Sequence, residues 1–223
     1  MKKSEINMIH NYLASIGVNY PLKKEFTNIS PEEVIIKVCS SKDLEIDKKN
    51  FFMLNYWFAK YHWLIHVERL KNMLKNSLLD DWTLDLIAGF CQKYHRMDHR
   101  LKAILRLRES QINGRAEHYR DDDYLLTKDG IEEDFKAWGF LLAKFQNENE
   151  RKLRPLEGLV KDNVWIKNRV LFGVNLRADI ASIRSFKTAK TAYEASKLAH
   201  CAPNAAKRNW DRSEEHTSEL QSH

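Results

Sequence analysis

The sequence predicts an all-α fold, because turn-forming residues are scarce and apolar residues recur at helical spacing. The chain of 223 residues holds only seven glycines and four prolines. Apolar residues three or four positions apart give a helix one face that can pack against a core. We expect an N-terminal helical bundle over residues 1–152, a linker over 153–162 and a smaller helical unit over 163–211.

Capping residues define the first elements of the bundle. A first helix is expected over residues 3–16, which carry one apolar face. In the segment 30–39, Ser30 can cap a helix, Pro31 suits its first turn and Glu33 occupies the capping-box position. We therefore expect a second helix there, in spite of its β-branched residues.

Longer helices are expected in the middle of the chain. One covers about 48–77 and the next about 81–110, and the short link between them predicts an antiparallel pair. Another helix is expected over about 129–151. The most apolar run, at 51–67, is interrupted by polar residues and falls short of the roughly 20 apolar residues of a membrane span, so it is interpreted as a core helix.

The composition favours a cytoplasmic protein with an acidic partner. Cys39, Cys91 and Cys201 are scattered without a CxxC pair, which indicates a reducing compartment and argues against a cysteine-based zinc site. No signal-peptide pattern is visible at the N-terminus. The formal net charge of +6 suits a phosphate-bearing or otherwise acidic partner.

The last residues read differently from the rest. Residues 212–223, RSEEHTSELQSH, resemble the translated read-through of a sequencing adapter. We therefore expect a non-native tail and exclude it from the interpretation of the fold. Without its one arginine and three glutamates, the chain has 36 Lys and Arg against 28 Asp and Glu. The native sequence is expected to continue past Asp211.

The segment 191–210, TAYEASKLAHCAPNAAKRNW, is typical of two short helices joined by a turn. The first would cover 191–200 and the second 203–211, with Pro203 in its first turn. Small inward residues would let the two helices cross closely, as a helix-turn-helix requires. The inward residues expected are Ala195, Leu198 and Ala199 on the first helix and Ala206 and Trp210 on the second.

The outward face of the second of these helices would present Asn204, Lys207 and Arg208. Arginine can bind guanine through two hydrogen bonds, asparagine can pair with adenine, and lysine can neutralise a phosphate. Lys190 and Lys197 are further candidate DNA contacts. A third helix is expected within 171–186, with Ile180 and Ile183 packing behind the pair.

These motifs carry a family resemblance. Residues 171–210, with LFGVNLRADI ahead of the segment just described, resemble the winged helix-turn-helix of poorly characterised prokaryotic regulators with a helical N-terminal region. The resemblance implies double-stranded DNA binding in transcriptional control, in a toxin–antitoxin-like or defence locus. The unit would be truncated before its wing, which should follow Asp211. Ala202 and Ala205 depart from the Ser or Thr common in such motifs.

Two pairs of histidines support an alternative function, a helical metal-binding enzyme or toxin. His62 with His66, and His95 with His99, have i,i+4 spacing and could each lie on one helix face. No HExxH or ExxH motif accompanies them, so half-buried core histidines are the simpler interpretation. No cofactor is expected, and no signature of a nucleotide-binding protein, hydrolase or ribonuclease is present. The sequence therefore favours a binding protein over an enzyme.

Two surface features leave further alternatives open. Lys93, Arg96 and Arg100 could form a basic stripe along a phosphate backbone, although a solvated helix face has the same pattern. The aromatic run 51–63 is too dense for one core-facing stripe. Some of its rings could serve a homodimer or a partner protein, which would make the chain a protein-interaction module.

Overall fold

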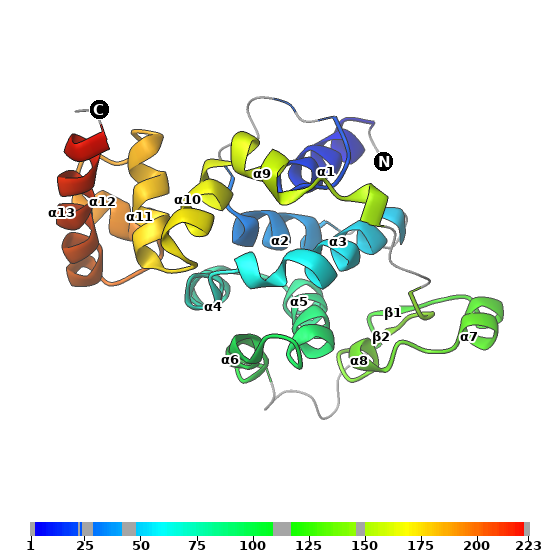
Figure 1. Ribbon diagram of the computed structural model, residues 1–223. Coiled ribbons are helices and arrows are strands. Elements are labelled where there is room, and N and C mark those ends of the chain that lie inside the picture. The colour runs from blue at the N-terminus through cyan, green and yellow to red at the C-terminus, as the bar shows by residue number, and fades with distance from the viewer. Residues whose placement is uncertain are drawn as a thin grey trace.

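The computed structural model confirms the all-α class (Figure 1). It describes residues 3–21, 23, 29–41, 48–108, 117–145 and 150–220. Within these ranges the chain is predominantly helical, and its regular β-structure is one pair of two-residue strands. No helix in the described ranges has the length and apolar character needed to cross a membrane.

The N-terminal half of the chain forms the body of the bundle. Its helices are α1 (Lys3–Ser15), α2 (Pro31–Cys39), α3 (Lys48–Tyr61), α4 (Val67–Asn76), α5 (Asp81–Tyr94) and α6 (Lys102–Leu105). The predicted capping box opens α2: the Glu33 amide donates to Ser30 Oγ at 3.3 Å, and the Ser30 amide donates to Glu33 Oε2 at 3.1 Å. The local prediction for this helix is confirmed.

The remaining elements complete the bundle and build a second helical group. They are β1 (Tyr119–Arg120), α7 (Asp123–Asp129), α8 (Glu133–Lys136), β2 (Phe140–Leu141), α9 (Leu156–Asp162), α10 (Val164–Phe172), α11 (Leu176–Ser185), α12 (Ala192–Leu198) and α13 (Pro203–Leu220). The C-terminal group, α11 to α13, lies to one side of the bundle in Figure 1, and α10 connects the two.

The prediction of one continuous helix over 48–77 is wrong. It ends at Tyr61, passes through a 3₁₀ turn at His62–Leu64 and restarts as α4 after an extended Ile65. The His66 amide donates to the Glu32 carboxylate at 2.8 Å, instead of to a helical carbonyl. A hydrogen bond to a distant buried acid therefore replaces the helical pattern.

The other two long helices are also interrupted. The one predicted over 81–110 ends at Tyr94, and Asp98 caps the 3₁₀ turn His99–Leu101 that leads into α6. In the part that the structure describes, the one predicted over 129–151 is replaced by α8, by β2, which pairs in parallel with β1, and by a 3₁₀ turn at Glu150–Lys152; residues 146–149 lie outside the described ranges. Gly130 and Gly139 have positive φ, a backbone conformation that ends regular helix.

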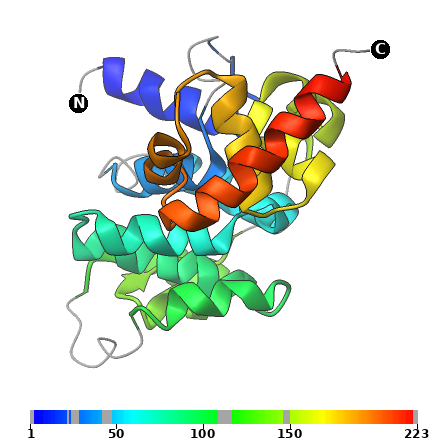
Figure 2. The same ribbon diagram turned by 90° about the vertical axis from the view of Figure 1, so that its left-hand side faces the viewer.

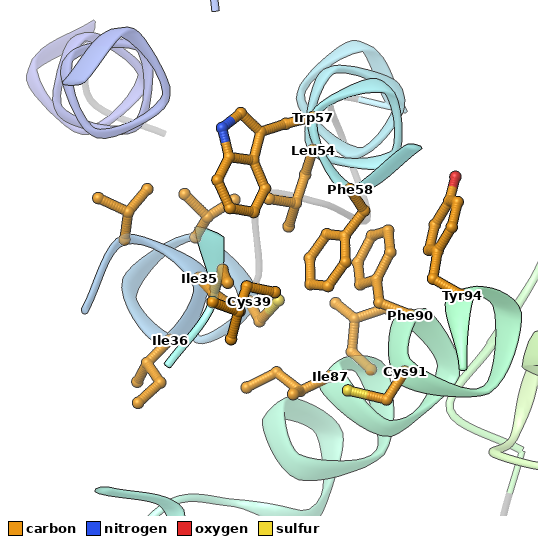
Figure 3. Packing of buried hydrophobic residues seen from close by; sticks show 14 of the residues in the cluster. Ile35, Ile36, Cys39, Leu54, Trp57, Phe58, Ile87, Phe90, Cys91 and Tyr94 are labelled. Carbon is orange, nitrogen blue, oxygen red and sulfur yellow. The ribbon is translucent and has the colours of Figure 1, made fainter. Parts of the chain in front are cut away.

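The main hydrophobic core is built around aromatic rings from α3 and α5 (Figure 3). Phe58 and Phe90 stack with their centroids 4.8 Å apart, and Trp57 donates from Nε1 to the Ile16 carbonyl at 2.7 Å. Gly89 lies under the Phe135 ring, where an added Cβ would come within 2.4 Å of a ring carbon. Most of the aromatic run at 51–63 is therefore core, while Trp63 remains partly exposed.

The expected linker at 153–162 is instead part of the bundle. It contains α9, whose Leu159 is fully buried in the main core and contacts the bare Cα of Gly17. The change of core falls one helix later, in α10. There Ile166 belongs to the main core and the adjacent Trp165 belongs to a second, smaller core.

Candidate nucleic-acid interface

The segment 191–210 forms two helices with a break between them. Thr191 caps α12 by accepting from the Glu194 amide at 3.2 Å, and the Lys190 amide donates to the Glu194 carboxylate at 2.7 Å. His200 then adopts a positive φ of 52°. The chain reverses, and Pro203 begins α13, where its missing amide hydrogen leaves no helical bond unmade. The second helix extends to Leu220, beyond the predicted 203–211.

Alanines let α12 and α13 approach each other closely. Ala195, Ala199 and Ala206 are buried, and Trp210 packs against the cluster that they form with α11. The Arg184 guanidinium lies 4.7 Å from the centroid of the Trp210 ring and donates to the Trp210 carbonyl at 3.1 Å. Leu198, expected to face inward, is instead 41% exposed.

Ile180 and Ile183 of α11 fill the space behind the pair, as the sequence predicted. All three helices pack on one another, and α13 contacts both α12 and α11. The unit is therefore a three-helix arrangement in which α13 has one face on the small core and the other face outward (Figure 2).

The outward face of α13 is cationic and free of the bundle. Asn204, Lys207 and Arg208 are exposed, as are Lys190 and Lys197 beside them. The Lys197 ammonium lies 4.6 Å from the centroid of the Tyr193 ring, which holds it near the α12 surface. Without the tail, residues 187–211 carry five Lys or Arg against two acidic residues, so this segment has a net positive charge.

A buried ionic cluster, which we call the joint, fixes the three-helix unit to the bundle. Its central residue is Arg169 of α10, which donates to both carboxylate oxygens of Glu32 at 2.8 Å and to Asp179 Oδ1 at 2.8 Å. His66 Nδ1 lies 2.6 Å from the other oxygen of Asp179. Arg69 lies over Trp165, with the guanidinium carbon 4.2 Å from the ring centroid.

The joint is charge-compensated and excluded from solvent. Glu32 and Asp179 are fully buried, and Arg169 is 1% exposed. Burial alone would raise the pKa of Asp179, but Arg169, His66 and Arg69 outweigh it and lower the pKa of that carboxyl group below its usual range. The Asp179 carboxylate is therefore held ionised between α10 and α11, beside the ion pair that Arg169 forms with Glu32 of α2.

The turn between α12 and α13 is itself tied to the bundle. The side-chain amide of Asn72, in α4, donates to the His200 carbonyl at 2.8 Å. Helical periodicity does not predict this bond or the joint, because Asn72 and His200 lie 128 residues apart and Glu32 and Arg169 lie 137 residues apart. A fully buried arginine within the apolar run of α10 is the one local hint, since an isolated charge there requires a partner.

The residues of the predicted basic stripe do not lie on one continuous helix. Lys93 lies in α5 and forms a 2.7 Å ion pair with Glu132, while Arg96 lies in the turn that follows. Arg100 lies beyond that turn, where it binds the Asp98 carboxylate at 2.6 Å and the Trp63 carbonyl at 3.1 Å. The break at 95–98 removes the i,i+3/i+4 relation on which the stripe was based.

The histidine pairs are also divided by helix breaks. His62 Nδ1 lies 2.8 Å from the Phe58 carbonyl, and His66 faces Asp179 in the joint. His95 Nδ1 lies 2.6 Å from the Gln92 carbonyl, and His99 belongs to the next 3₁₀ turn. Within the described ranges, no group of three or more His, Cys, Asp or Glu side chains could hold a metal ion.

Comparisons of the chain with protein-family models, with curated proteins and with solved structures found no match. The function is therefore inferred from the residues of the interface alone.

Proposed function

We propose that the chain binds double-stranded DNA through α13. The observation that carries this proposal is the exposed face formed by Asn204, Lys207 and Arg208 on a helix whose opposite face is anchored by Ala206 and Trp210. A helix packed across its predecessor after a short turn is the geometry with which helix-turn-helix proteins present side chains to the major groove.

The residue types on this face suit two different kinds of contact. Arg208 and Asn204 have the hydrogen-bonding geometry to read base edges, whereas Lys207, Lys190 and Lys197 suit phosphates. Ala202 and Ala205 offer no hydroxyl groups at the start of the helix. Affinity would therefore depend on the cations more than on neutral hydrogen bonds.

The joint supports the same function by holding the interface rigid. Arg169 and Asp179 fix α11 to the bundle, and α11 supports α13 through Ile180 and Ile183. A groove-reading helix needs this support, because contacts to base edges depend on the orientation of the helix. We extend the proposal to transcriptional control, with the bundle as the part that would receive a signal or a second copy of the chain.

Selection from a random duplex library tests the proposal. We expect the parent chain to enrich a defined sequence motif. Arg208→Ala should lose about 1–3 kcal/mol of discrimination between bases at one base pair of that motif. Lys207→Ala should weaken binding to all sequences by the same amount. The matched control is Lys161→Ala, which removes an exposed lysine of α9 and should enrich the same motif as the parent chain. Failure of the parent chain to retain any duplex at low salt would overturn the proposal.

A further inference from the structure

A solvent-open depression lies beside the joint, between the bundle and the three-helix unit. It has a volume of about 670 Å³ and is lined by the start of α4, by the 3₁₀ turn and α6, and by the turn between α10 and α11. The side that faces the viewer in Figure 2 carries α13 above, with α4 and α6 below it. The polar residues that matter here are His66, His99, Arg100, Lys102, Arg106 and Asn175.

The lining is strongly biased toward positive charge. Arg100, Lys102 and Arg106 are basic; Arg100 is paired with Asp98 at 2.6 Å, and the one acidic residue of the lining, Glu68, is paired with Lys71 at 3.1 Å. Within the described ranges, neither Lys102 nor Arg106 forms an ion pair of its own. A concave surface lined by one sign of charge concentrates ions of the opposite sign.

Parts of this lining are held in place before any ligand arrives. The Arg100 guanidinium is fixed by Asp98 and by the Trp63 carbonyl, while its side chain remains 45% exposed. Asn175 is fixed at the start of α11, where it accepts from the Ala178 amide at 3.2 Å. A site whose groups are already ordered loses less conformational entropy on binding.

We propose that this depression binds a small molecule that bears phosphate groups. Lys102 and Arg106, with the exposed part of the Arg100 side chain beside them, suit a multiply charged anion. Val67, Ala103 and Val174 provide an apolar wall for the remainder of the molecule. The volume is in the range of sites for ligands of nucleotide size, about 300–1,000 Å³. The proposal does not rest on DNA binding.

The position of the site would let a bound ligand influence the orientation of the three-helix unit. His66 lines the depression and also bonds Asp179 in the joint, so one side chain touches both the ligand and the link to α11. A ligand that bridges α6 and the α10–α11 turn would favour the orientation of the three-helix unit seen here. It would shift the population toward this orientation by its difference in affinity between arrangements.

Calorimetric titration with inorganic tripolyphosphate at low ionic strength tests the site without DNA. We expect saturable binding by the parent chain and by Lys161→Glu, and affinity lower by about tenfold or more in the double variant Lys102→Glu/Arg106→Glu. Both substituted residues are exposed, so the fold should persist. Lys102→Ala/Arg106→Ala is the milder second variant and should show a smaller loss.

Two results would overturn the proposal. Equal tripolyphosphate affinity in all variants would show binding elsewhere, and an absence of saturable binding by the parent chain would show that the cations are only a solvated surface. The same variants are then titrated with duplex DNA. Weakened DNA binding in Lys102→Glu/Arg106→Glu, without tripolyphosphate binding by the parent, would assign the depression to the DNA backbone and reject the small ligand.

Discussion

The two cores of the molecule are built on opposite principles. The bundle core is filled by rings such as Phe58, Phe90 and Phe135, whereas four of the seven buried residues of the second core are alanines. Rings bury a large apolar area, which stabilises the bundle directly. Alanines bury little area but let helix backbones approach closely. The small side chains of the three-helix unit therefore allow its helices to cross closely but stabilise it little. We infer that the unit relies on the joint for much of its stability.

The largest expected effect comes from the joint. Arg169→Met would leave the buried carboxylates of Glu32 and Asp179 without their shared partner, and should lower the free energy of unfolding by about 3–5 kcal/mol. Urea denaturation followed by circular dichroism measures the loss. Arg208→Met, on the exposed face of α13, is the control and should change stability by less than about 0.5 kcal/mol. Equal effects of the two substitutions would contradict the importance of the joint.

The bundle core should be sensitive to a loss of volume. Phe90 stacks on Phe58 and contacts Phe135 edge-on with centroids 5.1 Å apart. Phe90→Ala should therefore lower the free energy of unfolding by about 3–5 kcal/mol through lost area and a residual cavity. Phe90→Leu keeps most of the volume and should cost clearly less. If the two variants were equally stable in urea, the rings would not be closely packed.

The second core should be sensitive to a gain of volume. Ala195 is fully buried where α12 packs against its neighbours, so Ala195→Leu should push the helices apart at a cost of about 1–3 kcal/mol. Ala202→Leu, in the exposed turn, is the matched control. Thermal denaturation of the two variants gives the comparison. A stabilising Ala195→Leu would reveal unfilled space between the helices.

The joint should also make stability depend on pH. The pKa of Asp179 is lower in the folded chain than in the unfolded one, so its contribution is fully present above the unfolded value of about 3.9 and is lost as the pH falls. We expect the parent chain to lose more stability than Asp179→Asn between about pH 5 and pH 3. Parallel loss in the two proteins, measured by urea titration at each pH, would remove Asp179 as the cause.

The smallest expected effect is a difference in the rate at which cysteines of the two cores react with a thiol reagent. Burial raises the pKa of all three thiols, but Cys39 and Cys91 are fully buried in the bundle core, whereas Cys201 is only partly buried in the turn before α13. A thiol reagent such as dithiobis(nitrobenzoate) should therefore label Cys201 first. Cys201→Ser should remove this fast phase. A fast phase that persists in that variant would indicate ready opening of the bundle.

Sequence patterns predicted what is encoded locally. The capping box at Ser30 and the turn before Pro203 depend on residues within a few positions of each other, and both are present. The break at His66 depends on Glu32 and Asp179, which are 34 and 113 residues away in the sequence. Helical periodicity contains no information about such partners, so the long helices were predicted as continuous. The His62/His66 pair is divided at this break, whereas the His95/His99 pair and the basic stripe are divided at the break over residues 95–98.

The glycines near β2 were a signal that the prediction did not use. Gly130 and Gly139 flank the segment that turns away from helix, and both adopt a positive φ. Phe135, Trp138 and Leu142, which lie within the helix predicted over 129–151, are all buried. Their burial is achieved by a short helix and a strand, because spacing alone does not distinguish these arrangements.

The most direct test of the central claim is the salt dependence of duplex binding, measured by fluorescence anisotropy. The claim is that the exposed cations of α13 form the DNA contact. We expect the duplex affinity of the parent chain and of Lys161→Glu to fall steeply as the salt concentration rises. Lys207→Glu/Arg208→Glu should bind more weakly, and the slope of log affinity against log salt concentration should be smaller by about two. Identical affinities and slopes for all three proteins would contradict the claim.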